Sequence, residues 1–561
     1  MRSRRRCGLA AVATAAALAL VLSGCGSGGS GDNGEVVGAD KVGVGVNNIK
    51  PVSRNQLRDG GDLSWPLDAL PDNFNALHID GTQLENAEVM SALMPKAFAV
   101  QPDASVRVDE NYFTSIELTG QNPQRVTYTI NPKATWNDGT PLTWRDMQSQ
   151  WQGLNGTNQT FLAASTTGYE DIDSVQRGEN DKQTVVTFAR NFGEWRSLFG
   201  SIYPTATTSD PTTFNKGWIN QIPATAGPFT LQTIDQTGRT ITLVRNEKWW
   251  GEPAKLDRII YRVTDRAALA DSLANGEIDF YRIGSDVNLF QRARGIQGIE
   301  IRQAIEPIYN HITLNGGAGS ILADPELRKA VVRGIDRQAI ADALVGQIVP
   351  NATPLGNYIY VQGSANYVDH SQSVSYNPEA ARSALDRLGW TLQGNVRSKD
   401  GQQLTIDLVT TASNPIGERI SQLTQAQLAE IGVQVNINPA PAAAFFTDYV
   451  TPGNFEMVGF AWSGTPFPVT STRNIYTTGG EQNYGSIGSQ EIDRLYEEAI
   501  RTLDDQRRVE LGQQIDQAIW NLMPQVPMYQ ITGAYAVRAT LANFGAPGFA
   551  SVVYEDIGYT R

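Results

Sequence analysis

The residues of this chain that are best suited to chemistry are aromatic and polar side chains that follow the mostly apolar stretch Phe455 to Phe460. Apolar walls with a few convergent polar groups are what a cleft for a small ligand requires. Trp462 ends the predicted buried strand, where α/β sheets open their ligand crevice. The pattern therefore indicates binding. The candidate ligand-binding residues are Trp462, Ser463, Gly464, Thr465, Arg473, Asn474, Tyr476, Asn483 and Tyr484.

Packing in the core is the alternative role for any tryptophan. We expect that role for Trp136, Trp144, Trp249 and Trp250, whereas Trp462 could either pack in the core or line the cleft.

Residues for catalysis or metal binding do not form a motif. The histidines, His78, His311 and His370, lie far apart in the chain, whereas a zinc site needs clustered ligands at defined spacing. No Walker-type phosphate loop is present. The nearest approximations to Gly-x-Ser-x-Gly lie in a Gly/Ser-rich stretch that cannot hold a nucleophile rigidly. We therefore expect neither catalytic activity, nor a metal, nor a cofactor.

The elements that must position the candidate residues alternate between helix and strand. We predict a strand over residues 404–410, a helix over 416–431 and an alternating strand over 433–437. That order implies a right-handed parallel crossover, so the second half of the chain is an α/β domain.

The C-terminal part continues with a predicted helix over residues 491–523 and a strand over 525–532. The acid pairs Glu497-Glu498 and Asp504-Asp505 are expected on solvated faces of that helix rather than as a general acid and base.

The first 24 residues have the pattern of a targeting segment, with arginines at positions 2 and 4–6 and an apolar run over 8–22. Leu22-Ser23-Gly24-Cys25 resembles the bacterial lipobox, which predicts lipidation of Cys25. An ordinary secretory signal with a chance cysteine is the alternative. Cys7 would be removed with the leader, which leaves Cys25 without a partner for a disulfide. Residues 25–50 are rich in Gly, Ser, Asp and Asn and predict a flexible tether.

The charge of the chain argues against nucleic acid as a partner. Without the four arginines of the leader, 41 Lys and Arg face 58 Asp and Glu, which gives a net charge near −17. No basic stretch offsets these acids.

The stretch from Val126 to Trp151 begins as an alternating strand and ends as a helix. Thr143 and Asp146 have the spacing of a capping box at the start of that helix. The string of Trp136, Asp138-Gly139, Pro141, Thr143 and Asp146 resembles the signature of the family 5 extracytoplasmic solute-binding proteins of ABC importers, the oligopeptide and dipeptide binders. A second string, from Ala226-Gly227-Pro228-Phe229 to Leu256-Asp257, matches the same family.

The resemblance implies a two-lobed type II periplasmic-binding fold with an additional subdomain. It assigns residues 51–85, 211–310 and 525–561 to lobe I, 86–210 to an accessory subdomain of lobe I, and 311–524 to lobe II. A monomer would hold a solute between hinged lobes and deliver it to an ABC permease and ATPase on the extracytoplasmic face of the cell membrane, touching the membrane through its N-terminal lipid only.

The resemblance also adds candidate residues to the cleft. Asn315 matches a strand-ending asparagine of the family, and Thr82 and Gln83 would face it from the other lobe. In the peptide binders an Asp shortly after the tryptophan pairs with the amino group of the peptide. This chain has no acid between Trp462 and Glu481, and a neutral hydroxyl cannot supply that ion pair.

Oligopeptides are the default ligand class, and a sugar-bearing or lipidic ligand also fits an aromatic, uncharged lining. The alternative function is that of a non-transport accessory protein. Some mycobacterial lipoproteins that resemble this chain act in assembling mannosylated phosphatidylinositol glycolipids, and the Arg- and Ala-rich leader suits an actinobacterium.

Overall fold

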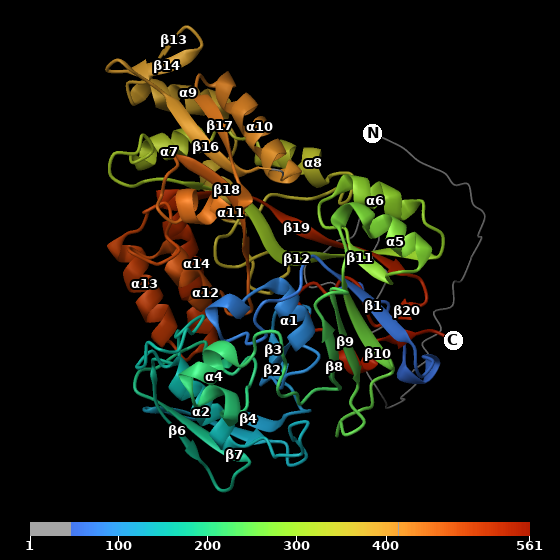
Figure 1. Ribbon diagram of the computed structural model, residues 1–561. Helices are drawn as coiled ribbons and strands as arrows, with labels where there is room; N and C mark the ends of the chain where they lie inside the picture. The colour runs from blue at the N-terminus through green and yellow to red at the C-terminus, as the bar shows by residue number, and fades with distance from the viewer. Residues whose placement is uncertain (1–46, 413) are drawn as a thin grey trace, which may run out of the picture. The chain divides into compact units, whose positions relative to one another are not determined.

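A computed structural model describes residues 47–412 and 414–561, and Figure 1 shows their helices and strands. Every described element belongs to one compact unit. The predicted leader, the lipidation site at Cys25 and the tether up to residue 46 lie outside the described residues. Among residues 47–412 and 414–561, no helix is long and apolar enough to cross a membrane.

The largest sheet has six strands in the order β11-β19-β12-β18-β16-β17. Its two long central strands, β12 and β19, pair antiparallel with each other. β11 pairs with the C-terminal end of β19, and β18 pairs with the C-terminal end of β12. The two long strands therefore link the two sides of this sheet (Figure 1). The bounds are β11 Phe280–Arg282, β12 Ile299–Leu314, β16 Thr405–Thr411, β17 Gln434–Ala440, β18 Met457–Ser463 and β19 Gln525–Arg538.

The pairing of β12 with β19 changes register in the middle of both strands. Ile305 pairs with Thr532, but Tyr309 pairs with Gln530, so the β12 strand carries two extra residues between these pairs. A bulge of this kind bends a strand locally. The strand predicted over residues 525–532 begins as expected but continues to Arg538. The predicted boundary between residues 310 and 311 falls inside β12. The division into lobes stays a prediction.

The predicted crossover is confirmed. β16 and β17 are parallel, and α10 (Pro415–Glu430) connects them. Asn414 caps α10 by accepting the backbone N–H of Gly417 at 3.2 Å. β18 is also parallel to β16, so these three strands end at the same edge of the sheet.

The N-terminal half of the chain contains two four-stranded sheets, β1-β10-β9-β8 and β4-β5-β7-β6. The predicted capping box is present at the start of α2 (Trp144–Leu154), where the backbone N–H of Thr143 donates to Asp146 at 2.9 Å. Strand bounds are β1 Asp62–Leu67, β2 Phe98–Val100, β3 Val106–Val108, β4 Phe113–Gln121, β5 Gln124–Ile130, β6 Ile172–Arg177, β7 Gln183–Phe188, β8 Phe229–Asp235, β9 Thr240–Arg245 and β10 Arg258–Val263.

The predicted helix over residues 491–523 is two helices, α13 (Gln490–Arg501) and α14 (Asp505–Leu522). Asp504 lies between them and accepts the backbone N–H of Arg507 at 2.7 Å, so it is the N-cap of α14 and not part of a helix face. The acid pair at 504–505 thus marks a helix boundary.

The remaining elements are short, and among them β13, β14 and β15 form a three-stranded sheet and β20 pairs with β21. They are α1 Leu84–Met90, α3 Thr205–Thr208, α4 Pro211–Lys216, α5 Leu269–Asn275, α6 Val287–Arg294, α7 Pro325–Val332, α8 Arg337–Val345, α9 Pro378–Arg387, α11 Ala442–Ala444, α12 Pro468–Tyr476, β13 Thr391–Gln393, β14 Val396–Lys399, β15 Gln402–Gln403, β20 Leu541–Ala542 and β21 Gly558–Tyr559.

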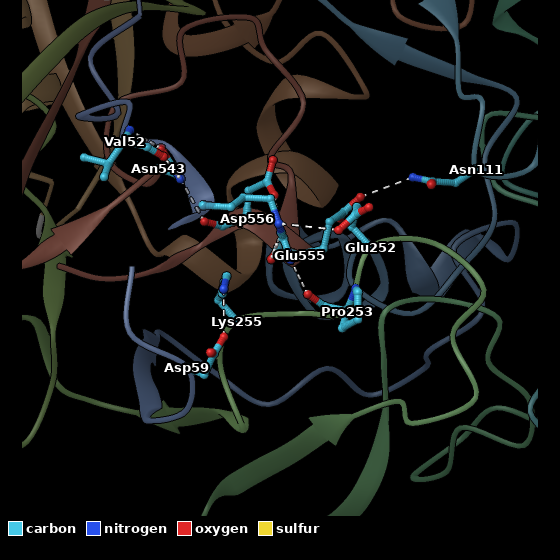
Figure 2. A network of polar contacts seen from close by, with 10 residues as sticks. Val52, Asp59, Asn111, Glu252, Pro253, Lys255, Asn543, Glu555 and Asp556 are labelled. Carbon is cyan, nitrogen blue, oxygen red and sulfur yellow. Dashed lines mark hydrogen bonds and ion pairs between the residues drawn. The ribbon is translucent and has the colours of Figure 1, made fainter. Parts of the chain in front are cut away.

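The first and last described segments are joined by a polar network, which Figure 2 shows. The side chain of Asn543 accepts the backbone N–H of Val52 at 2.7 Å and donates to the backbone oxygens of Val52 and Asp556, each at 2.9 Å. Lys255 pairs with Asp59 at 2.7 Å. The end of the chain therefore packs on the elements that begin the folded body.

The tryptophans behave largely as predicted. Trp136 and Trp249 are buried in the core. Trp250 is half-buried, packs against Tyr112 and donates its Nε1–H to the backbone oxygen of Asn111 at 2.7 Å. Trp144 is also half-buried, with the Arg145 guanidinium over its ring.

Candidate functional site

The carboxyl ends of β16, β17 and β18 lie at one edge of the six-stranded sheet. Their last residues are Thr411, Ala440 and Ser463. Ligand crevices in α/β proteins form outside this edge of parallel strands. Trp462 and Ser463 stand on it because they end β18, which agrees with the position predicted for Trp462.

Trp462 belongs to an aromatic cluster at this edge, which we define as His311, Phe446, Phe460, Trp462 and Tyr484. The rings of His311 and Tyr484 lie nearly parallel to the Trp462 ring, each within 8°, at centroid distances of 5.8 and 6.2 Å. Phe460 meets Trp462 edge-on at 5.1 Å. Trp462 and Tyr484 are both partly exposed, and Phe446 is 46% exposed. The cluster therefore offers ring faces and edges on which a ligand can pack.

Two buried nitrogens of the aromatic cluster have no hydrogen-bond partner among the described residues, Nε1 of Trp462 and Nδ1 of His311. Nε2 of His311 lies 3.0 Å from the hydroxyl of Thr313. Burial lowers the pKa of His311 to about 3, so its ring is neutral at neutral pH. An indole N–H is a donor only, and that of Trp462 meets no acceptor within residues 47–412 and 414–561.

The loop after Trp462 is held to the bulge of β12. The backbone N–H of Gly464 donates to the backbone oxygen of Pro307 at 2.5 Å. Gly464 has little space, because a Cβ there would lie 3.0 Å from the methyl groups of Val361. Ser463 is exposed, and the hydroxyl of Thr465 accepts the backbone N–H of Phe467 at 3.1 Å.

Glu194, which the sequence did not single out, holds the helix that follows this loop. α12 has no side-chain cap of its own. The Glu194 carboxylate accepts the backbone N–H of Val469 at 3.2 Å and that of Thr470 at 2.7 Å. Its side chain is buried, and burial raises its pKa. A carboxylate at a helix N-terminus is stabilising, and here it comes from the predicted accessory subdomain and joins it to predicted lobe II.

A cavity of about 380 Å³ lies beside this contact. Thr465 and Phe467 line it from one side, and Glu194, Arg196 and Arg508 are among the charged residues of its wall. The predicted loop therefore borders a cavity that the accessory subdomain also lines.

Asn315 lies apart from Trp462, and its part in the ligand site stays a prediction. β12 runs antiparallel to β18, so Leu314 pairs with Met457 while Tyr309 pairs with Trp462. Asn315 thus lies at the opposite edge of the sheet, about 20 Å from Trp462 at the ordinary rise of a strand. Its side chain donates to the backbone oxygens of Gly453 and Phe455 at 3.0 and 2.8 Å, which is a structural role.

Two further candidates also have structural roles. Tyr476 is 1% exposed and donates its hydroxyl to Gln525 at 3.1 Å, so it belongs to the core and not to a cleft wall. Asn483 donates to the backbone oxygens of Thr477 and Ile487, both at 2.9 Å, and thereby closes the loop that carries Tyr484. We therefore leave Tyr476 out of the proposed site and assign Asn483 the role of holding the loop of Tyr484 in place.

The remaining candidates stay predictions. The side chains of Arg473 and Asn474 are partly exposed and make no hydrogen bond or ion pair with another described residue. Thr82 and Gln83 are exposed just before α1, where Thr82 donates to the backbone oxygen of Ile79 at 3.3 Å. No contact within the described part of the chain joins either of them to the aromatic cluster.

Comparison with known proteins agrees with these features. A sequence model described as bacterial extracellular solute-binding proteins, family 5 Middle, matches residues 113–484. The chain is 45% identical over 509 residues to the oligopeptide-binding protein OppA of Mycobacterium tuberculosis, which covers 90% of this chain and 86% of that protein. It is 28% identical over 433 residues to the probable monoacyl phosphatidylinositol tetramannoside-binding protein LpqW of the same organism, over 71% of this chain and 67% of that protein.

Solved structures share the fold. The periplasmic EDTA-binding protein EppA superposes with a TM-score of 0.85 at 24% identity and covers 94% of this chain and 100% of its own. The oligopeptide-binding protein AppA of Bacillus subtilis, solved with a nonapeptide, gives a TM-score of 0.73 at 21% identity over 90% of this chain and 100% of its own.

Proposed function

The chain belongs to the bacterial extracellular solute-binding proteins of family 5, and we propose that it captures oligopeptides between two hinged lobes and presents them to an ABC importer. The 45% identity to an oligopeptide-binding protein over most of both chains supports this ligand class. Ligand binding favours the closed state only through its higher affinity for that state.

The observation that carries the proposal is the position of the aromatic cluster. It stands at the carboxyl edge of β16, β17 and β18, and Gly464 ties its loop to Pro307 in the bulge of β12. A ligand that packs on Trp462 therefore acts on the strand that connects the two predicted lobes. We propose Trp462, Ser463, Gly464, Thr465 and Tyr484 as one wall of the ligand site.

The absence of an acid shortly after Trp462 leads to a specific expectation about how a peptide binds. No carboxylate follows Trp462 before Glu481, so this segment offers a peptide hydroxyls and ring faces but no counter-ion for a free amino group. We expect free and N-acetylated forms of one peptide to bind with affinities within about threefold of each other. That is less than 1 kcal/mol, whereas a hydrogen bond to a charged group contributes about 1.5–3 kcal/mol.

The experiment is a titration of the purified protein, shown by mass spectrometry to be free of bound ligand, with peptides of four to nine residues in free and N-acetylated forms. Binding is followed by calorimetry and by the rise in melting temperature. If no peptide binds, the oligopeptide assignment is wrong. If only the free amino forms bind, a carboxylate outside the Trp462 segment holds the amino group.

A glycolipid is the second candidate ligand, because the nearly parallel rings of Trp462 and Tyr484 also suit the apolar face of a sugar. The 28% identity to LpqW supports testing it. Mannosides and phosphatidylinositol mannosides belong in the same titration, and binding of these with no response to peptides would favour the accessory role over import.

We further propose that the protein works as a monomer, held at the extracytoplasmic face of the cell membrane by a lipid on Cys25. Radiolabelled palmitate incorporation that is lost in Cys25→Ala tests the anchor. Co-purification of a permease and an ATPase with the intact protein tests its role in import.

A further inference from the structure

Gln530 lies in the same row of paired residues as Trp462. Tyr309 of β12 pairs with Trp462 on one side and with Gln530 on the other. Residues directly opposite each other on neighbouring strands point to the same face of a sheet. Gln530 and Trp462 therefore share a face and stand two strands apart, which is about 10 Å at the usual strand spacing. The Gln530 side chain is only 6% exposed, so its partners are groups of the protein.

The side-chain amide of Gln530 joins β19 to two other segments of the chain. Its Oε1 accepts the backbone N–H of Gln362 at 2.5 Å. Its Nε2 donates to the backbone oxygens of Gln362 at 2.8 Å and of Glu306 at 3.0 Å. Both N–H groups and the oxygen of the amide are thus engaged. Because Glu306 lies in the bulge of β12 and Gln362 in the loop before α9, the amide fixes the distance between bulge and loop.

The residues next to these two partners are Pro307 and Val361, and both touch Gly464. The backbone oxygen of Pro307 accepts the N–H of Gly464 at 2.5 Å. A Cβ at Gly464 would lie 3.0 Å from both methyl groups of Val361. Val361 also belongs to the small apolar cluster against which Trp462 packs. The two segments that Gln530 ties together are therefore the ones that confine the loop after Trp462.

We propose that Gln530 is a positioning residue of the ligand site. By fixing the bulge of β12 relative to the segment of Val361, it sets the place of residues Trp462 to Thr465, which we call the ligand loop. This role rests on the proposed function, in which the ligand loop receives a peptide. Gln530 also stands where the pairing of β12 and β19 departs from regular register, so a change in the angle between these strands moves the ligand loop with it.

Gln530→Met tests this role, because methionine keeps the length of the side chain and removes both donors and the acceptor. The matched control is Gln303→Met. Gln303 is a buried glutamine of the partner strand β12, 5% exposed, and donates to the backbone oxygen of Ile348 at 2.9 Å. Ile348 belongs to a different apolar cluster from the one on which Trp462 packs. Both variants lose a buried amide, but only one of these amides holds the ligand loop.

The first measurement uses the unliganded protein. Hydrogen exchange, resolved to single amides by fragmentation of the peptides, reports on the N–H of Gly464, which bonds to Pro307 and not to Gln530. Gln530→Met should speed this exchange about tenfold, as expected when a buried hydrogen-bonding group loses its partner. Gln303→Met should leave it unchanged. Equal exchange at Gly464 in the two variants would overturn the proposal.

Val361→Ala tests the route from Gln530 to the ligand loop. It should also speed the exchange of Gly464, because it removes the methyl groups that face this residue. In the double variant with Gln530→Met, the combined effect should be smaller than the product of the two single effects, since both changes release the same loop. Effects that multiply fully would show that Gln530 does not act through Val361. If Gln530→Met gives no cooperative melting curve, Gln530→Asn, with an amide one methylene shorter, takes its place.

The second measurement is calorimetry with the tightest-binding peptide of the oligopeptide titration. Gln530→Met should lower its affinity about tenfold, again the size of one buried hydrogen bond left unmade, and Gln303→Met should not. Faster exchange at Gly464 with unchanged affinity would exclude Gln530 from the ligand site. If the wild-type protein binds no peptide, the oligopeptide assignment fails, whereas the exchange rates still decide whether Gln530 holds the loop.

Discussion

The carboxylate of Glu194 accepts the backbone N–H of Thr470 at 2.7 Å, although 276 positions of sequence separate the two residues. Gly193 next to it donates its backbone N–H to Ile500 at 2.6 Å. The predicted accessory subdomain therefore supplies the cap of α12, the helix that begins directly after the proposed ligand loop.

Replacing Glu194 by Ala should lower the free energy of unfolding by about 1 kcal/mol, as loss of a helix cap does. It should also weaken peptide binding, because the N-terminus of α12, which follows the proposed ligand loop, is then no longer held by hydrogen bonds to Glu194. Glu194→Gln keeps one acceptor and should recover part of both effects. Denaturant unfolding and calorimetry measure these changes. Glu179→Ala, an exposed glutamate of the same subdomain, is the control. Wild-type binding by Glu194→Ala would exclude a role for the cap in ligand capture.

Trp462→Ala should lower peptide affinity at least about tenfold, in the range of a buried aromatic anchor. It should also destabilise the unliganded protein, because Trp462 packs against His311, Phe460 and Tyr484. The comparison is Trp151→Ala, also half-buried, whose Nε1–H donates to the backbone oxygen of Tyr169 at 3.2 Å in the accessory subdomain. If both variants lose stability and both keep affinity, Trp462 is a packing residue only.

Gly464→Ala should weaken binding, whereas Gly459→Ala, within β18, should not. A Cβ at Gly464 would lie 3.2 Å from the oxygen of Pro307 as well as against Val361, so the loop must shift. At Gly459 the nearest atom, the oxygen of His311, is 3.9 Å away. Calorimetry with one peptide compares the pair. Equal affinities would show that the loop position does not matter for the ligand.

Glu88 should make stability depend on pH. Burial raises its pKa from 4.5 to about 7, and the charge of Arg282 offsets part of the rise. The folded protein then binds more protons than the unfolded chain between these values. Stability should therefore rise as the pH falls through 7 and level off below 4.5, by about 3 kcal/mol in all.

Denaturant unfolding of Glu88→Gln between pH 4 and 8 isolates this contribution, because the variant should lose that part of the slope. Glu117→Gln, an exposed glutamate on β4, should keep the wild-type slope. A Glu88→Gln curve parallel to that of the wild type would show that Glu88 titrates normally.

Local signals in the sequence predicted local structure well. Thr143 and Asp146 form the expected capping box, and the crossover through α10 joins two parallel strands. The helix break at Asp504 was missed because acid pairs suit both a solvated face and an N-cap. Here the side chain of Asp504 bonds to the backbone of Arg507.

The site was predicted only in part, because strand direction and long-range contacts leave no local pattern. Trp462 stands at the end of an apolar strand, so its position at the carboxyl end of that strand could be inferred from the sequence. The separation of Asn315 from Trp462 could not be foreseen, because nothing in the segment of Asn315 shows that β12 is antiparallel to β18. Glu194 meets α12 only after the chain has folded, and Phe446 follows a run of alanines and Phe445, a pattern that does not indicate a ligand site.

The two strands that run through both predicted lobes limit how those lobes can move. β12 and β19 are joined by backbone pairing from Ile299 with Arg538 to Thr313 with Gln525, and the pairing departs from regular register only between Ile305 and His311. Sliding one strand along the other would break this ladder, whereas bending at the bulge would not. Relative motion of the lobes should therefore be nearly pure rotation about this irregular region with almost no translation, and residues 305–311 would set the angle at which the two lobes close on a ligand.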